Sequence, residues 1–384
     1  MIIVFITNKT ITLDTILPIL IEAKKCNNQK IVIVVSRKNG LTVIENNVVL
    51  NDIINEIGFK FLFGGRYRSK WYKRTVGSFQ FLLLFISGLF GAKFIHFETL
   101  PLITIKILSI FFKKNVFYSE RDSIECDWYK HPSHHVNKFE KKYIKTKYPV
   151  PLGGNFISYN KGRLNYYYGS DIYSKRKAYL LGPTRQRGVW KEYIYSITDY
   201  YFNKFHKDVD TSKGIIFIVL SYYGSNVTKE KKYGQKRLRE NFEKTIEALS
   251  RTKANIPVFL KPHNFTDIEY VKTVLSEREG FHITYLHPSI LLQKTKFIVS
   301  NLYSTIFGDA HSMGIPTVEY AYYPDYIKKD VGDVSVCPRY VDWFVYDDIN
   351  KFEKICVMLI KKEFVSKKII NNYEEKDDVL EALY

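Results

Sequence analysis

Short apolar segments alternate with longer segments of helical spacing through most of this 384-residue chain. The longer segments include 12–26 and 100–112. The short ones are rich in Ile, Val, Phe and Tyr, which favour strands, and in the first half they are 2–6, 30–35, 59–63, 94–97 and 115–118. Strands that alternate with helices predict a parallel sheet covered by helices on both faces.

A second alternating block begins at Gly214, after the polar stretch 207–213. Its apolar segments are 214–220, 256–260, 281–286, 297–300 and 317–320. At about 100–200 residues per domain, a chain of this length favours two domains. We therefore expect an α/β protein with two Rossmann-like domains, residues 1–205 and 206–384, whose parallel sheets face a central cleft. The second domain is expected to include the terminal helices.

Composition restricts the kind of partner and the kind of metal chemistry. The chain has 58 Lys and Arg against 39 Asp and Glu, so 58 − 39 gives a net charge of +19 and predicts an anionic partner. The basic residues are scattered, and no RRM, KH or helix-turn-helix signature is present, so we expect no nucleic-acid partner. The four cysteines show no CxxC or metal-type spacing, which argues against a disulfide scaffold or a zinc site.

Polar residues follow the strands of the second block, where ligands bind in open α/β sheets. Ser221, Gly224 and Ser225 form a loop that can turn backbone N–H groups toward a phosphate, although an ordinary turn has the same composition. Lys261 and His263 follow the next strand and offer an ammonium and an imidazole to one anion; surface charge beside a structural histidine is the alternative.

A third strand end carries hydroxyl groups. Ser300 closes the strand, and Ser304 and Thr305 open the helix that follows. Hydroxyls at this place can cap the helix, or they can add donors to an anion site. Three successive strand ends with phosphate-compatible groups together predict nucleotide binding by the second domain.

Acidic residues occupy a strand end in the first half. Glu120 and Asp122 follow the strand 115–118, and Glu98 follows the strand before it. A carboxylate in this position can serve as a general base. The alternative is solvated loop charge, with Arg121 pairing with either neighbour.

These motifs resemble those of bacterial GT-B sialyltransferases and related enzymes that use CMP-activated ulosonic acids. The segment from Phe117 to Asp122 looks like their acidic motif, Lys261-Pro-His263 is similar to their Lys-x-His-Pro motif, and Ser304-Thr305 matches their paired hydroxyls. Asn264 stands where the motif has proline, and no glycine follows the acidic pair.

The resemblance implies a GT-B-like fold and an inverting, metal-independent transfer of a sialic-acid-like or Kdo-like sugar from a CMP donor. The acceptor would be a capsule or lipopolysaccharide glycan, and no cofactor would be needed. Glu120 or Asp122 would be the base, His263 would assist departure of CMP, and Ser304 and Thr305 would hold its phosphate. A CDP-glycerol-dependent glycerophosphotransferase of the teichoic-acid type is one alternative, and a non-catalytic polyanion-binding protein is another.

A basic aromatic segment suggests attachment to a membrane surface. Residues 66–74 contain five cations and three aromatic residues, and the uncharged stretch 75–92 follows. Trp and Tyr suit the headgroup region, and cations favour anionic lipid. The start of the chain lacks the features of a signal peptide. We expect a cytoplasmic protein on the inner face of the membrane, bound to a glycan or glycolipid acceptor. The alternatives are a solvated or acceptor-binding loop at 66–74, and a membrane span or a buried helix at 75–92.

Overall fold

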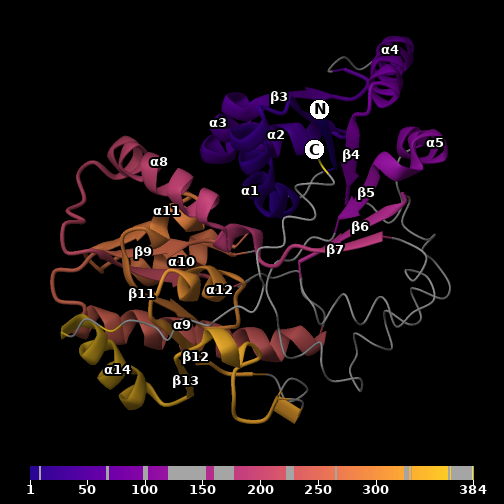
Figure 1. Cartoon of the computed structure of the whole chain (residues 1–384). Helices are drawn as coiled ribbons and strands as arrows, with labels where there is room; N and C mark the ends of the chain where they lie inside the picture. Colours follow the sequence, from indigo (N-terminus) through magenta and orange to yellow (C-terminus); the bar gives the residue numbers. More distant parts are fainter. Residues whose placement is uncertain are drawn as a thin grey trace. The chain divides into compact units, whose positions relative to one another are not determined.

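The chain folds as two compact units (Figure 1). The structure is a computed structural model that describes residues 1–7, 10–65, 69–97, 103–119, 153–159, 177–221, 229–263, 266–323, 328–329, 331–361, 364 and 383. Among the described residues, the chain passes from the first unit to the second between Trp190 and Lys191, and Leu383 near its end belongs to the first unit again. The sequence-based limits of 1–205 and 206–384 set this passage somewhat later.

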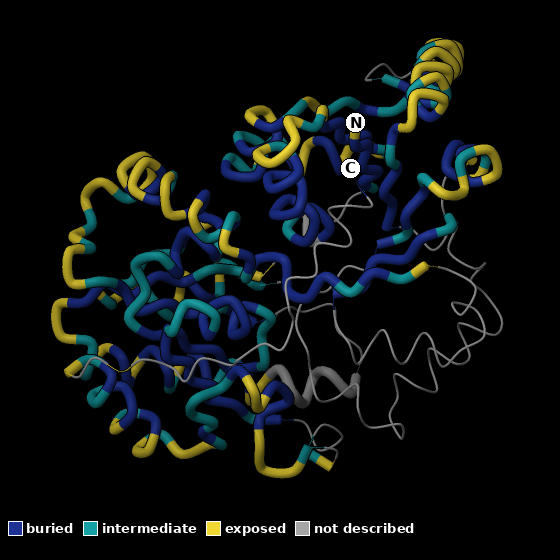
Figure 2. Tube along the Cα trace, viewed as in Figure 1, coloured by how far each residue is buried: buried dark blue, intermediate teal, exposed yellow. Residues whose placement is uncertain are grey.

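The first unit contains a seven-stranded sheet in which all neighbouring strands are parallel. Its strand order is β3-β2-β1-β4-β5-β6-β7. The strands are β1 (Ile2–Ile6), β2 (Ile31–Val35), β3 (Gly58–Leu62), β4 (Lys93–His96), β5 (Val116–Ser119), β6 (Asn155–Ser158) and β7 (Lys177–Leu180). The central strands β1 and β2 are buried along their whole length (Figure 2), which explains why they contain only apolar residues.

The helices assigned to this unit cover the sheet. They are α1 (Thr10–Asn27), α2 (Lys38–Asn46), α3 (Val48–Ile57), α4 (Lys70–Leu89) and α5 (Ile103–Phe111); α8 (Gly188–His206) begins here and continues into the second unit. A buried ion pair joins Arg187 to Glu22 of α1, with nitrogen–oxygen distances of 2.5 and 2.8 Å. This two-bond pair fixes the segment before α8 onto α1.

The second unit contains a six-stranded sheet, also parallel throughout. Its strand order is β10-β9-β8-β11-β12-β13, and its strands are β8 (Ile215–Val219), β9 (Val258–Lys261), β10 (Phe281–Ile283), β11 (Thr295–Ser300), β12 (Thr317–Ala321) and β13 (Trp343–Tyr346). The helices are α9 (Lys229–Thr252), α10 (Ile268–Leu275), α11 (Pro288–Leu292), α12 (Ile306–Ser312) and α14 (Ile349–Lys361).

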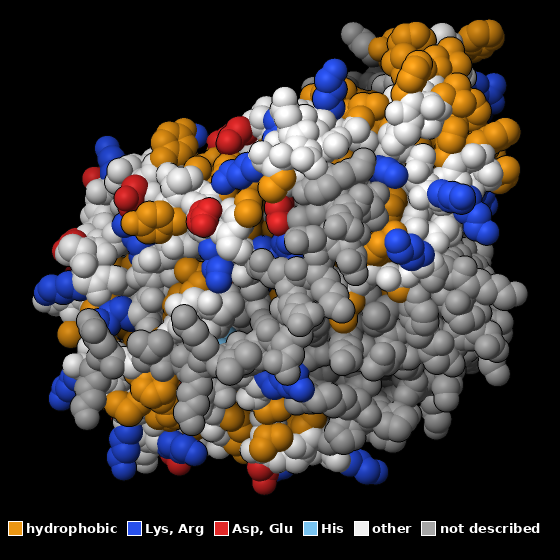
Figure 3. Space-filling model, viewed as in Figure 1, with side chains coloured by type: hydrophobic (Ala, Val, Ile, Leu, Met, Phe, Trp, Pro, Cys, Tyr) orange, Lys and Arg blue, Asp and Glu red, His pale blue; other side chains and the backbone are white. Residues whose placement is uncertain are grey.

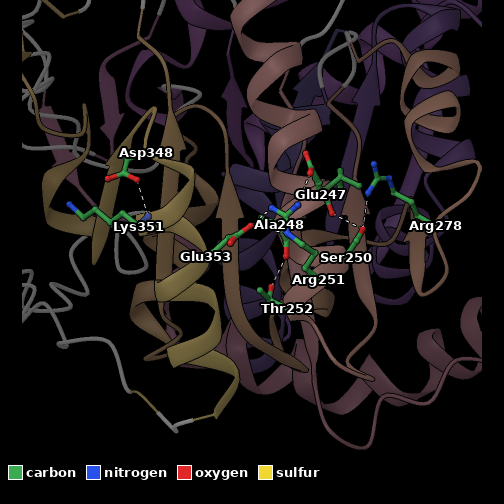
Figure 4. Close-up of polar contacts among 10 residues, drawn as sticks. Glu247, Ala248, Ser250, Arg251, Thr252, Arg278, Asp348, Lys351 and Glu353 are labelled. Atoms are coloured by element: carbon green, nitrogen blue, oxygen red, sulfur yellow. Dashed lines mark hydrogen bonds and ion pairs between the residues drawn. The ribbon is translucent and has the colours of Figure 1, made fainter.

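Ion pairs on the surface join α9 to α14 (Figure 4). Arg251 of α9 donates to Glu353 of α14 and to Glu247 one turn before it, the latter at 2.5 Å. Arg278, which follows α10, donates to the hydroxyl of Ser250 on α9 at 3.1 Å. These exposed contacts hold helices that already pack together, so they add little to stability.

Both sheets follow the doubly wound order, in which the first strand in sequence lies at the centre and the order reverses beside it. In the first unit the reversal lies between β1 and β4, and in the second it lies between β8 and β11. The prediction of two Rossmann-like parallel sheets is confirmed. The predicted strand 281–286 is shorter, because only Phe281–Ile283 pair with β9.

The uncharged stretch 75–92 forms most of α4. This helix is only partly buried, so it is not the fully buried helix considered from the sequence. Leu84 is buried against the sheet, but Phe79 and Leu89 on the solvent-facing side of the helix are 61% and 66% exposed. Among the described residues, no helix combines the length and the apolar character that a membrane span requires. The role of this exposed apolar face is taken up below.

Candidate functional site

The order reversal of the second sheet brings the ends of β8 and β11 side by side. Ser300, the last residue of β11, pairs with Val219, the last residue of β8. Ser221 follows two residues after β8, and its side chain is 7% exposed. The edge formed by the carboxyl ends of β8, β9 and β11, called the switch edge below, is where parallel α/β sheets bind ligands.

The hydroxyl of Ser221 is the most informative atom of the switch edge. Its oxygen is buried and has no hydrogen-bond partner among the residues that the structure describes. A buried hydroxyl without a partner destabilises the protein by about 1–3 kcal/mol, so such groups generally have a ligand or a structural explanation. The switch edge therefore contains a donor that a bound molecule could satisfy.

A threonine that the sequence analysis did not single out joins two strand ends. The Thr266 hydroxyl accepts a hydrogen bond from the backbone N–H of His263 and donates one to the carbonyl of Ser221, each at 2.8 Å. It therefore holds the residues after β9 against the residues after β8. His263 and Ser221, which are separated in sequence, are linked through this one side chain.

Lys261, the last residue of β9, and His263, two residues later, have different surroundings. The ammonium of Lys261 donates to the carbonyl of Tyr285 at 3.4 Å. The side chain of His263 is exposed, yet partial desolvation of its imidazole lowers the pKa of His263 below its ordinary value. A neutral imidazole in contact with solvent can donate a hydrogen bond to a bound phosphate through its N–H, and its other ring nitrogen can accept a proton.

The turn after β11 is held by its own side chains. The Ser300 hydroxyl donates to the carbonyl of Leu302 at 2.6 Å, so Ser300 fixes this turn, and its predicted ligand contact stays a prediction. Asn301 is fully buried and donates to Thr245 of α9 and to the carbonyl of Tyr320 of β12. These bonds set the direction in which the chain leaves the sheet.

Ser304 and Thr305 lie half-buried at the start of α12. The Ser304 oxygen accepts a hydrogen bond from the backbone N–H of Ile306 at 3.3 Å, and the Thr305 side chain caps no N–H of the helix. Capping uses only the oxygen of Ser304, because a hydroxyl that accepts a bond still has a hydrogen to donate. Both hydroxyls could therefore donate to a phosphate.

Several predicted site residues lie outside the described residues. These are Glu98, Glu120, Asp122, Gly224 and Ser225. The described chain stops at Ser119 on one side of the acidic pair and at Ser221 before the glycine-containing loop. Their roles stay predictions from the sequence.

The carboxyl edge of the first sheet also carries buried polar groups. The Ser119 hydroxyl at the end of β5 lies 2.6 Å from the Tyr159 hydroxyl, which follows β6. His96, at the end of β4, is fully buried, and its ring centroid lies 5.5 Å from that of Tyr118. The sequence signal for these residues was only their position after apolar strands, which many structural residues share.

A fully buried carboxylate lies one strand from the switch edge. Glu319 of β12 pairs with Ser300 in the sheet register and accepts hydrogen bonds from Tyr323 (2.6 Å) and Ser335 (2.5 Å). Burial raises the pKa of Glu319 to about 7, although the two hydroxyl donors oppose the shift. These bonds fasten the segment around Ser335 to β12.

Stability is therefore expected to depend on pH through Glu319. Its pKa is higher in the folded state than the ordinary 4.5, so the folded protein binds more protons and loses stability as pH rises from about 4.5 to 7. Glu319→Gln mimics the protonated group. Its unfolding free energy should gain about 3 kcal/mol relative to wild type between pH 4.5 and 8. Urea unfolding at several pH values measures this gain. The exposed control Glu277→Gln should show none, and equal pH dependence in Glu319→Gln and wild type would contradict the assignment.

Metal ligands do not gather in the described ranges of the chain. Within them, no group of three or more His, Cys, Asp and Glu side chains is arranged to hold a metal ion. The switch edge instead carries the hydroxyls of Ser221, Ser304 and Thr305 and the imidazole of His263. Such donors suit an anion.

Two solved structures with the same fold are UDP-GlcNAc 2-epimerases, and a third contains UDP. UDP-GlcNAc 2-epimerase from Methanocaldococcus jannaschii superposes with a TM-score of 0.56 at 12% identity, covering 100% of this chain and 99% of that one. The Neisseria meningitidis UDP-GlcNAc 2-epimerase bound to UDP-GlcNAc gives 0.52 at 12% identity, with 100% and 99% covered. A UDP co-structure of MnaA from S. aureus gives 0.52 at 10% identity, with 98% and 94% covered.

The comparisons by sequence give no family. No protein-family model matches the chain, and no curated protein matches it. Identities of 10–12% establish a shared fold alone, and none of the three structures is a sialyltransferase. The chain therefore has the GT-B-type fold of two Rossmann-like units that these enzymes share.

Proposed function

We propose that this protein is a glycosyltransferase that binds a nucleotide-activated sugar at the switch edge and transfers the sugar to a glycan acceptor. The observation that carries the proposal is the buried hydroxyl of Ser221 where β8 and β11 meet, which has no hydrogen-bond partner among the described residues. It lies in the position where doubly wound sheets bind nucleotides. His263 is tied to the same strand end through Thr266.

The donor that we propose is a CMP-activated sialic-acid-like or Kdo-like sugar. Support comes from the motifs Lys261-Pro-His263 and Ser304-Thr305 and from their places after β9 and before α12. Departure of CMP leaves negative charge on one phosphate. Hydroxyl donors and a histidine stabilise that charge, because preorganised donors act most strongly where charge develops. The acceptor hydroxyl must lose a proton, and we assign that role to Glu120 or Asp122.

A UDP-sugar is the second candidate donor. The specific observation in its favour is that the structural neighbours were solved with UDP-GlcNAc and UDP. CDP-glycerol is the third candidate donor. Transfer of glycerol phosphate from it would use the same histidine and hydroxyls at these strand ends. The three candidates share the switch edge and differ in the nucleotide.

Thermal unfolding with a panel of ligands separates these candidates. A ligand at 100 times its Kd adds about 2.7 kcal/mol to the unfolding free energy, which raises Tm by several degrees. We expect CMP to give the largest increase among CMP, UDP, CDP-glycerol and a DNA duplex at matched ionic strength. Cytidine, which lacks the phosphate, is the control and should give little change.

Other outcomes of the panel reassign the activity. A larger increase with UDP would favour a UDP-sugar enzyme, and a larger increase with CDP-glycerol would favour glycerol phosphate transfer. Stabilisation by the duplex alone would indicate a polyanion-binding protein. No increase with any nucleotide would contradict the proposal.

A further inference from the structure

The solvent-facing side of α4 and α5 is apolar, which is the reverse of an ordinary surface helix. Seven large side chains on it are 61–86% exposed, and we call this set the α4–α5 face: Trp71, Phe79, Leu89, Phe90, Ile103, Ile110 and Phe111. Apolar side chains gather over these two helices at the upper right of Figure 3. Soluble proteins rarely expose an apolar surface of this kind unless it binds something.

The face is firmly supported from beneath, so its exposure belongs to the folded unit. Leu84 and Leu108 on the opposite sides of the two helices are buried in the core with β1, β2 and β4. The helices touch through Phe85 and Phe111, whose ring centroids lie 5.3 Å apart. Gly88 allows this approach, because a Cβ there would lie 2.5 Å from the ring of Phe112.

The segment of the chain that carries the face is strongly basic. Between Glu56 and Glu120 the chain contains ten Lys and Arg and a single acidic residue, Glu98, whereas the whole chain has 58 basic and 39 acidic residues. Exposed cations stand on both helices and just after α5: Lys70, Lys73, Arg74, Lys106, Lys113 and Lys114. Such a surface complements an anionic one.

We propose that the α4–α5 face docks on an anionic lipid bilayer, with the two helices lying in the plane of the headgroups. An apolar face flanked by Lys and Arg, with an exposed tryptophan at one end, has the chemistry of an interfacial helix. The proposal goes beyond the glycosyltransferase assignment, because lipid binding by this face does not depend on any nucleotide. It would place the enzyme where a lipid-linked acceptor remains in the bilayer.

Co-sedimentation of the full chain with vesicles tests the docking. Vesicles of equal parts phosphatidylglycerol and phosphatidylcholine should bind the protein, and pure phosphatidylcholine should bind it far more weakly. Lys73→Gln/Arg74→Gln/Lys106→Gln should raise the lipid concentration for half-binding about 100-fold, because each cation near an anionic surface contributes to binding independently. The matched control Lys207→Gln/Lys213→Gln/Lys236→Gln removes three exposed lysines of the second unit and should change binding little.

The apolar part of the face has its own variant. Phe79→Ser/Leu89→Ser/Phe90→Ser should weaken binding at least about tenfold. The native side chains move from water into the bilayer when the protein binds, and the variant loses the favourable free energy of that transfer. A variant that melts like wild type and still binds like wild type would overturn the proposal. Tryptophan emission supplies a measurement without that variant: anionic vesicles should shift emission to the blue in wild type, and Trp71→Phe should lose the shift.

Two further results would overturn the proposal. One is equal binding to phosphatidylcholine and to the anionic vesicles, or no binding to either. The other is a wild-type dimer without lipid that Phe79→Ser/Leu89→Ser/Phe90→Ser converts to a monomer, since the face would then join two copies of the chain. Light scattering of both proteins measures this directly.

Discussion

Replacing Glu120 by Gln or Asp122 by Asn is expected to lower the rate of glycosyl transfer about 10²–10⁴-fold in whichever variant removes the general base. The acceptor hydroxyl is a weak nucleophile until a carboxylate takes its proton. Both residues lie within three positions of the end of β5, the strand that ends at Ser119. The measurement is the initial rate of transfer at saturating donor, with donor affinity measured separately.

The separate measurement of donor affinity distinguishes loss of the general base from loss of the fold or of the donor site. The inactive variant should bind the nucleotide as tightly as wild type does, because the nucleotide is assigned to the second unit. Its melting temperature should also be unchanged. Near-normal turnover in both variants would contradict the assignment and make Glu98 the next residue to test.

The sequence was sufficient to predict most strands of the described residues, because apolar runs in buried parallel strands are nearly continuous. It did not predict β6, β7 or β13. The segment 2–6 is β1 in full, and 317–320 lies within β12. For 75–92 the sequence left open a membrane span or a buried helix, and the structure contains a helix with one side buried and one side exposed, for a physical reason. A helix with apolar residues on all sides shows the helical spacing but does not show which side is covered, so exposure of Phe79 and Leu89 could be found only from the fold.

The switch edge was predictable as a set of strand ends but not as a network. Ser221, Lys261 and His263 were identified because ligand-binding residues follow parallel strands. Thr266 was not, since its bond to Ser221 joins residues 45 positions apart and no local pattern reports it. Asn301 was missed for the same reason, as its bond to Thr245 spans 56 positions.

The sequence indicates only in part that Glu319 is a buried carboxylate. A lone carboxylate inside the apolar run of β12 indicates a special environment, because buried charges are generally paired or neutral. The sequence does not reveal its two hydroxyl partners, Tyr323 and Ser335, which lie in the segment after the strand. The sequence therefore shows that Glu319 is unusual in its strand, but it does not show the hydroxyl groups that surround the carboxylate.

The central claim is that the nucleotide phosphate is bound at the switch edge of the second unit, and calorimetry with CMP tests it most directly. One lost hydrogen bond to a charged group is worth ~1.5–3 kcal/mol, so His263→Ala should weaken CMP binding about tenfold or more, and Ser304→Ala/Thr305→Ala about 100-fold or more. The exposed control Thr273→Ala on α10 should bind CMP as wild type does. Wild-type CMP affinity in both site variants would contradict the account and place the nucleotide elsewhere.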